Sequence, residues 1–287
     1  MKSGAFAFFV GPSVFIMLAL MTLPLLASIV LGLHYITFRN LNEPLWVGFQ
    51  NYQEVLNDPE FWDSLEFTLL FIAVAVPLRI LFGLLFALLL DQITRIRGVF
   101  IAAALVPFVM TPVVGTLIFR DMFDRGGPYW YWMQQLFDYR LFMNSTTVPL
   151  LIIFHSIWTA TPFVMIVLFA GLQTLPQESL EAARVDGASW LQQLWHVAIP
   201  HLRSLFVFIG LISIMDSYRV FDSVFVLTSQ NPIYDAETIM YYNFQVALSF
   251  GRLGKANAMS VLTVIGIFVV LIPFLVITYR DQVEESS

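Results

Sequence analysis

Ionisable and hydroxyl side chains interrupt an otherwise apolar stretch late in the chain, SIMDSYRVFDS. Asp216, Arg219 and Asp222 recur every three residues, so on a helix Arg219 could pair with either acid. Spacings of three and four residues also place a set of hydrogen-bonding residues on one helical face: Ser213, Asp216 and Ser217. Two interpretations stay open. The charges form an ion-pair cluster that only holds helices together, or the face binds the hydroxyl groups of a sugar.

A further charge lies inside a different apolar stretch. Arg79 falls midway along it, and an ionisable residue in such a place usually faces a bundle interior or a cavity. We expect Arg79 to be the counter-ion of an acid on a neighbouring helix, with a role in binding an anionic substrate as the alternative. The four histidines show no spacing with each other or with carboxylates that predicts metal ligands. We therefore predict no metal site and no catalytic residue.

The composition sets the class of protein that must position these side chains. Hydrophobic residues make up 59% of the 287 residues and charged residues only 12%, whereas soluble domains carry about 25% charged residues. This shortfall is typical of membrane proteins. The formal net charge of −6 gives no electrostatic support for a nucleic-acid partner. The absence of cysteine excludes disulfides and thiolate metal sites.

Apolar stretches long enough to cross a bilayer occur six times. We therefore predict an all-α polytopic membrane protein, a single transmembrane domain over residues 1–287. Its six helices are expected at about 5–35, 66–90, 98–120, 147–172 (within the stretch from Leu141 to Leu175), 203–228 and 256–279. The first stretch has an apolar core longer than the 7–15 residues of a signal peptide, so we interpret it as a retained helix. Six crossings place both termini on one side, but lysine and arginine residues divide equally between the two sets of loops and do not choose that side.

A polar, amphipathic insert over 178–200 separates the fourth and fifth predicted spans. Its first part, 178–185, is rich in Glu and Ala and favours a short helix. Gly187 is a typical helix stop, and a second short helix is expected over 190–197 before Pro200. Taken by itself, this pattern is compatible with an amphipathic hairpin on the membrane surface.

The same insert resembles the EAA loop of binding-protein-dependent ABC importer permeases. The resemblance rests on Glu181-Ala182-Ala183, Asp186-Gly187-Ala188 and Pro200, with Val197-Ala198-Ile199-Pro200 where Ile-x-Leu-Pro is commoner. The segments VGFQNYQEVLNDPEFWDSLEFTLLF, TPFVMIVLFAGLQTLPQESLEAARVDGAS and VFDSVFVLTSQNP are similar to the carbohydrate, maltose-transporter subclass. Gln230-Asn231-Pro232 stands where that subclass usually has Gly-Gly-Pro.

This resemblance implies a transport subunit rather than an enzyme. It implies that the EAA loop is a cytoplasmic coupling helix that docks on a dimer of ABC ATPase subunits, which hold ATP and Mg²⁺, while this chain binds no cofactor. It also implies a second, homologous permease, an extracytoplasmic solute-binding protein and a sugar-like solute. The expected location is the bacterial or archaeal cytoplasmic (inner) membrane, among its lipids, with both termini in the cytoplasm. The chain has no G-x-x-x-x-G-K-[ST] phosphate loop of its own.

The resemblance also implies where the solute passes. The sugar-contacting positions of the subclass fall on Ser213, Asp216 and Ser217 in the fifth span, and on Ser156, Ala160 and Phe163 in the fourth. Ala160 and Phe163 are apolar, so the solute is not expected to be held as maltose is, and Thr159 and Trp158 lie close by. The predicted pathway therefore comprises Ser156, Thr159, Phe163, Ser213, Asp216 and Ser217.

One alternative function comes from a different class. An ion-coupled secondary transporter or a polytopic membrane enzyme could use Asp216, Arg219 and Asp222 as a proton relay. This alternative explains the charges within the membrane, but it does not explain the EAA loop.

Overall fold

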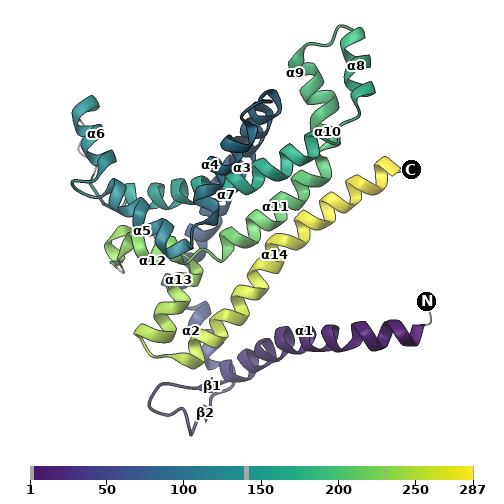
Figure 1. The fold of residues 1–287 in the computed structure, drawn as a ribbon. Helices are drawn as coiled ribbons and strands as arrows, with labels where there is room; N and C mark the ends of the chain where they lie inside the picture. Colours follow the sequence, from purple (N-terminus) through teal and green to yellow (C-terminus); the bar gives the residue numbers. More distant parts are fainter. Residues whose placement is uncertain (1–2, 139–141, 230, 287) are drawn as a thin grey trace. The chain divides into compact units, whose positions relative to one another are not determined.

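The computed structural model describes residues 3–138, 142–229 and 231–286, drawn in Figure 1. Leu141 and Gln230, which the sequence analysis names, lie outside the described residues. The chain forms two compact units. The first comprises Met1–Asp63 and Ile239–Pro273, and the second comprises Ser64–Thr238 and Phe274–Ser287.

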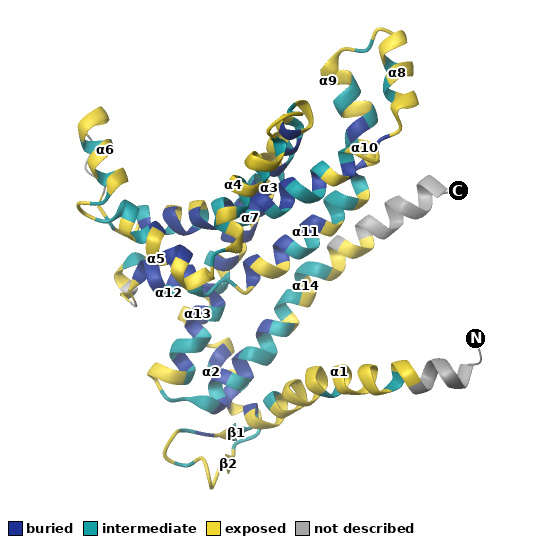
Figure 2. Cartoon of the chain, in the orientation of Figure 1, coloured by how far each residue is buried: buried dark blue, intermediate teal, exposed yellow. Residues whose placement is uncertain are grey.

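The first unit contains the long N-terminal helix and the greater part of the long C-terminal helix. Its elements are α1 (Ser3–Gly32), the antiparallel strands β1 (His34–Tyr35) and β2 (Leu45–Trp46), α2 (Gln50–Leu56), the start of α3 (Pro59–Gln92), α13 (Ile239–Phe244), the π-helix η3 (Gln245–Ser249) and α14 (Leu253–Ser286). From residue 9 to residue 32, apolar side chains surround α1 on all sides and most of them are exposed (Figure 2). A helix of that kind suits a lipid environment.

Polar contacts tie α2 and the residues after it to α14 in this unit. Glu54 accepts a hydrogen bond from Arg252 at 2.6 Å, and Asp58 accepts one from Lys255 at 2.6 Å. The hydroxyl of Tyr242 also donates to Asp58, at 2.6 Å. Burial alone raises the pKa of Asp58, but the hydrogen bonds and positive charge of its partners outweigh burial and hold that pKa below its usual value.

The second unit contains the remaining helices (Figure 1). Beyond the rest of α3, they are α4 (Arg97–Val109), α5 (Pro112–Phe123), α6 (Pro128–Phe137), α7 (Thr147–Leu172), α8 (Gln177–Val185), α9 (Trp190–Gln193), the π-helix η1 (Leu194–Ala198), α10 (Ile199–His201), α11 (Arg203–Tyr218), α12 (Asp222–Thr228) and the 3₁₀-helix η2 (Pro232–Tyr234).

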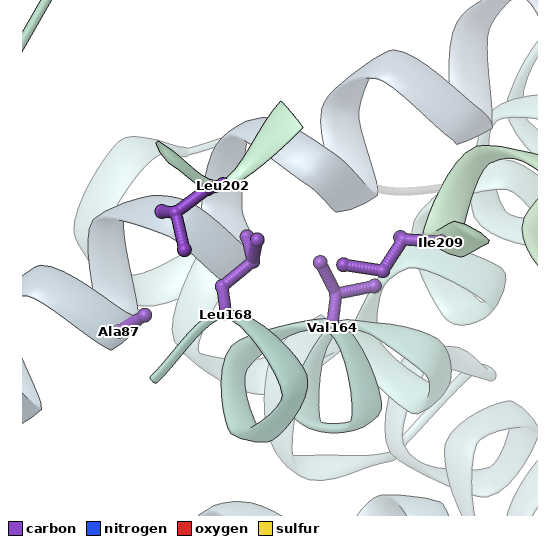
Figure 3. Packing of buried hydrophobic residues seen from close by; sticks show 5 residues of the cluster. All are labelled: Ala87, Val164, Leu168, Leu202 and Ile209. Carbon is purple, nitrogen blue, oxygen red and sulfur yellow. The ribbon is translucent and has the colours of Figure 1, made fainter. Parts of the chain in front are cut away.

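Close packing of α3, α7 and α11 builds the core of this unit. In Figure 3 the side chains of Val164 and Ile209 face each other, as do those of Leu168 and Leu202, with Ala87 beside them. A Cβ atom added to Gly83 would lie 2.3 Å from Cγ1 of Val164, so the approach of α3 to α7 requires glycine there. Small residues at helix contacts are typical of membrane bundles, in which packing rather than water exclusion holds helices together.

The all-α polytopic fold predicted from the sequence is confirmed. Within the described residues, four helices are long and apolar enough to cross a membrane by themselves: Phe9–Gly32, Pro59–Gln92, Thr147–Leu172 and Leu253–Pro273. Two bent helix pairs raise the number to six if each pair is one crossing. They are Arg97–Val109 with Pro112–Phe137, bent by 99°, and Trp190–His201 with Arg203–Tyr218, bent by 68°.

Two predicted helices are divided in the structure. The helix expected over 98–120 ends at Val109 and a new one begins at Pro112. Thr111 is extended there, as is usual before a proline. The helix expected over 203–228 ends at Tyr218, and α12 begins only at Asp222. No proline or glycine lies in this second break, so its cause must be sought in tertiary contacts.

Smaller differences affect the ends of the other helices. The second begins at Pro59 rather than at 66, and the first ends at Gly32 rather than at 35. The last begins at Leu253 rather than at 256. These shifts leave the order of the predicted spans unchanged.

Candidate substrate cavity and coupling loop

A cavity of about 480 Å³ opens where both divided helices are broken. Six helices of the second unit (α3, α4, α5, α7, α11 and α12) line it together with the chain at the two breaks. Its polar lining consists of Arg79, Thr111, Thr116, His155, Ser156, Thr159, Asp216, Arg219, Asp222 and Ser223. Both charge signs and several hydroxyls are present, so the cavity offers donors and acceptors to a polar, uncharged solute.

Arg79 is the deepest charge in this region, with only 4% of its surface exposed. Its Nη1 donates to Oγ of Ser217 at 2.9 Å and to the carbonyl oxygen of Ser213 at 3.4 Å, and its Nη2 donates to Oγ of Ser156. These hydrogen-bond partners are hydroxyls and a carbonyl. The acid on a neighbouring helix that the sequence analysis expected is Asp216 of α11, which acts on Arg79 through its charge. Its Nε has no hydrogen-bond partner among the described residues.

Of the two acids spaced three residues from it, Arg219 pairs with Asp216. Its Nη2 donates to Oδ1 of Asp216 at 2.8 Å, while Asp222 is the first residue of α12. The paired side chains of Asp216 and Arg219 are 57% and 63% exposed. Because a solvent-exposed pair contributes only about 0–1 kcal/mol, this ion pair does not account for the presence of two charges in an apolar stretch.

The predicted pathway residues fall into two groups. Ser156, Thr159 and Asp216 line the cavity, as does Ala160. Ser213 and Ser217 are buried with Arg79 and are not part of the lining. Phe163 packs against the core of α3, α7 and α11 and stacks on Phe108, with ring centroids 5.8 Å apart.

Four polar residues of the cavity were missed by the sequence analysis: Thr111, Thr116, His155 and Ser223. His155 and Thr116 approach each other, with 3.4 Å between Nε2 and Oγ1, and the ring of Phe119 meets His155 edge-on at 5.0 Å. Only the four-residue spacing of His155 and Thr159 on one helix could have indicated His155. Thr116 lies 39 residues before His155, so no local pattern connects the two.

The insert after α7 forms a compact helical hairpin (Figure 1). The end of α8 is closed by hydrogen bonds from Gly187 N to Arg184 O at 3.0 Å and from Ala188 N to Ala183 O at 2.9 Å. This is the Schellman arrangement, which needs a left-handed residue, and Gly187 has φ +77°. Ser189 and Gln192 then form a reciprocal capping box that starts α9. The helix predicted over 190–197 continues as a π-helical turn from Leu194.

Most of the EAA residues of this hairpin are exposed (Figure 2), including Glu181, Ala182, Asp186, Gly187 and Pro200. Ala183 and Ala188 are half-buried and line a shallow hollow of about 290 Å³ with Asp186 and Gly187. Large apolar side chains stand exposed nearby: Val185 is 88% exposed and Trp195 60%. Small residues around a hollow with an apolar border suit the close approach of another protein surface.

Comparison with known proteins places the chain in a family. No family model matches it. The trehalose/maltose transport system permease protein of Thermococcus litoralis is 30% identical over 271 residues, which cover 93% of this chain and 89% of that protein. The chain belongs to the sugar permease subunits of ABC transporters.

A second relative agrees with this family, and a solved structure agrees with the fold. The arabinooligosaccharides transport system permease protein of Bacillus subtilis is 27% identical over 278 residues, which cover 94% of this chain and 87% of that protein. The fold matches a chain of a bacterial alginate ABC transporter solved in complex with an alginate pentasaccharide-bound periplasmic protein, with a TM-score of 0.84 and 16% identity over 98% of this chain and 96% of that one.

Membership of this family decides between the classes of function that the sequence left open. The sugar permease is a multi-pass inner-membrane transport subunit and not an enzyme, and ATP hydrolysis belongs to a separate subunit. The alternative of an ion-coupled transporter or membrane enzyme is therefore set aside. Among the described residues no group of three or more His, Cys, Asp or Glu could hold a metal ion.

Proposed function

We propose that this permease forms one half of an import pathway for a sugar or sugar-like solute, and that the solute passes the cavity between α7 and the end of α11. The observation that carries the proposal is the cavity lining, in which Ser156 and Thr159 of α7 and Asp216 near the end of α11 surround one space beside the break in the fifth span. Irregular backbone at membrane depth is tolerated where it lines a cavity. Asp216 accepts hydrogen bonds from sugar hydroxyls there, and the hydroxyls of Ser156 and Thr159 can both donate and accept.

The remaining parts of the importer belong to other chains. A second, homologous permease supplies the other half of the pathway, and a solute-binding protein delivers the solute from outside. A dimer of ABC ATPase subunits, holding ATP and Mg²⁺, binds the exposed hairpin α8–α9 from the cytoplasm. This hairpin supports the proposal through its small residues Ala182, Ala183 and Ala188 and the exposed Val185. With the hairpin in the cytoplasm and six crossings, both termini are cytoplasmic as well.

The variant Asp216→Asn tests the proposed pathway in the assembled importer. Loss of a hydrogen bond to a charged group costs roughly 1.5–3 kcal/mol, which is about a tenfold to hundredfold loss of affinity. We expect sugar uptake at low solute concentration to fall by that factor while the complex assembles and keeps its basal ATP hydrolysis.

Arg219→Gln is the matched control, because it breaks the same ion pair and keeps the carboxylate of Asp216. The pathway proposal expects a much smaller loss of uptake in this variant. Equal losses in the two variants would show that Asp216 acts only through its pair with Arg219, and the proposed solute contact would be wrong.

A further inference from the structure

The helix α6 (Pro128–Phe137) separates apolar from polar side chains and contains no charged residue. With about 3.6 residues per turn, one arc of the helix holds Tyr129, Trp130, Trp132, Met133, Leu136 and Phe137. The remaining arc holds Tyr131, Gln134 and Gln135. An amphipathic helix of this kind usually buries its apolar face against another surface.

The rest of the chain covers little of this apolar face. The exposed fraction is 48% at Tyr129 and 56% at Trp132, and it reaches 66% at Leu136 and 70% at Phe137. Figure 2 shows α6 projecting from α5 with most of its surface exposed. The surface that covers the apolar face therefore comes from outside this chain.

Aromatic contacts connect α6 to a helix that crosses the membrane. Tyr129 stacks on Phe123 at the end of α5, with ring centroids 4.7 Å apart. Phe123 in turn meets Phe154 of α7 edge-on, with ring centroids 6.3 Å apart. Phe154 lies two turns into α7, which is long and apolar enough to cross a membrane by itself, and its side chain is 51% exposed. The apolar face of α6 thus continues the exposed apolar surface of a crossing helix.

The order of the elements places α6 at one end of that crossing. It precedes α7, whereas the hairpin α8–α9 follows α7, so the crossing puts α6 and the hairpin on opposite sides of the membrane. Arg125 and Asp138, both exposed, lie just outside the two ends of α6. The helix is therefore apolar on one face and bounded by charged side chains at the level where a bilayer meets water.

The residue types of α6 favour a lipid partner. Trp and Tyr are enriched at membrane–water interfaces, because their rings combine an apolar body with a polar atom. A helix with Trp, Phe and Leu on one face and polar residues on the other lies in the plane of the interface, with the apolar face about 5–10 Å into the boundary of headgroups and acyl chains.

We propose that α6 lies in the interface of the membrane leaflet opposite the hairpin α8–α9. Its apolar face, including Trp132 and Leu136, is directed to the acyl chains, and Gln135 is directed to water. Because the helix contains no charge, it binds the lipid surface through apolar area and aromatic rings and not through anionic headgroups. The location of α6 does not depend on which solute the permease carries.

A fluorescent label on α6 tests this location in the assembled transporter in nanodiscs. The chain contains no cysteine, so Leu136→Cys gives one site for an NBD label on this subunit once any cysteines of the partner chains are replaced. Two quenchers are compared: a phosphatidylcholine with a nitroxide high on its acyl chain, and iodide in the buffer. We expect the nitroxide lipid to reduce the emission of the label about twofold or more and iodide to reduce it only slightly.

Gln135→Cys is the matched control, because it carries the same label on the polar face one residue away. Iodide should quench this label strongly and the nitroxide lipid weakly. If Leu136→Cys does not assemble, Trp132→Cys gives the same test from the same face.

Three results would overturn the proposal. Iodide quenching without lipid quenching at the apolar positions would place α6 in water. Protection of these positions from both quenchers would show that another subunit covers the apolar face, and protection from iodide only after the solute-binding protein is added would assign the face to that protein. Equal lipid quenching at positions 135 and 136 would contradict the proposed orientation of the helix.

Discussion

Several of the residues that form polar contacts in this permease could be identified from the sequence. The three-residue spacing left Arg219 able to pair with Asp216 or with Asp222, and the structure shows the pair with Asp216 at 2.8 Å. Neither Ser213 nor Ser217 lines the cavity as predicted: Arg79 donates to the backbone carbonyl of Ser213 and to the hydroxyl of Ser217. That contact joins residues 138 positions apart, and no local pattern in one sequence reports such a pairing.

The pair of Asp58 and Lys255 gives a pH-dependent prediction at the residue scale. Both side chains are largely buried, and the pKa of Asp58 lies below its usual value because its hydrogen bonds outweigh burial. A carboxyl with a lowered folded-state pKa adds stability above its unfolded pKa, about 3.9, and loses it as the pH falls through the folded-state value. Asp58→Asn should therefore lower the midpoint of thermal unfolding at pH 7, and this deficit should shrink steadily below pH 4.

The control for this prediction is Glu43→Gln, at an exposed position whose backbone N–H donates to the carbonyl of Asn40. Its thermal midpoint should follow that of the unchanged protein at each pH. A deficit for Asp58→Asn that is the same at pH 3 and at pH 7 would show that the carboxylate charge does not stabilise the fold.

At the scale of elements, the sequence predicted long apolar helices well and their interruptions poorly. Pro112 carried a signal for the break at Met110–Thr111, because a proline favours the start of a helix over its interior. The break at 219–221 contains no proline or glycine, so no local signal in the sequence marks it. The hairpin was predicted closely because Gly187 is a local helix stop, and the Ser189–Gln192 box, which the sequence analysis did not use, is local as well.

Close packing in the core gives a prediction for an element contact. The variant Gly83→Val would place its side chain within the space of Val164, where a Cβ atom alone comes to 2.3 Å. Overpacking of this kind typically costs about 1–3 kcal/mol or more, so we expect poor assembly and a lowered thermal midpoint. Gly11→Val is the control, because a Cβ atom there meets nothing within 4 Å. Equal midpoints for both variants would contradict the packing of α3 on α7.

The hairpin α8–α9 gives a prediction about coupling. In Gly187→Arg a long charged side chain stands at the turn, which is exposed and bordered by small residues. We expect this variant to keep solute binding by the importer and to lose most of the ATP hydrolysis that the binding protein stimulates, measured on the purified complex.

Two variants separate bulk from backbone strain in that experiment. In Gly187→Ala the alanine must adopt the same left-handed backbone conformation as the arginine, at a cost of roughly 1–2 kcal/mol. Because it adds only a methyl group, this variant should keep most of the stimulated hydrolysis. Gly126→Arg repeats the large substitution at another exposed glycine with φ +89° and should hydrolyse ATP normally. Normal coupling in Gly187→Arg would remove the hairpin from the proposed ATPase contact.

At the scale of the whole molecule, composition and the EAA loop together were enough to reach the family. The 59% hydrophobic content predicted a membrane protein, and the loop predicted an ABC importer permease, which the relatives confirm. The loop charges did not decide on which side of the membrane the termini lie, because lysine and arginine residues are evenly divided between the two sets of loops. Reporter fusions after Ser287 and near Asp58 should report the cytoplasm and the outside respectively, and the same side for both would contradict the proposed topology.

The most direct test of the account is solute uptake by proteoliposomes that contain this permease with its partner permease, its ATPase dimer and the solute-binding protein. We expect uptake of a labelled sugar only when ATP is inside with the ATPase subunits and the binding protein is outside, with no uptake driven by an ion gradient alone. Uptake that proceeds without ATP but follows an imposed proton or sodium gradient would contradict the assignment of this chain as an ATP-driven sugar permease.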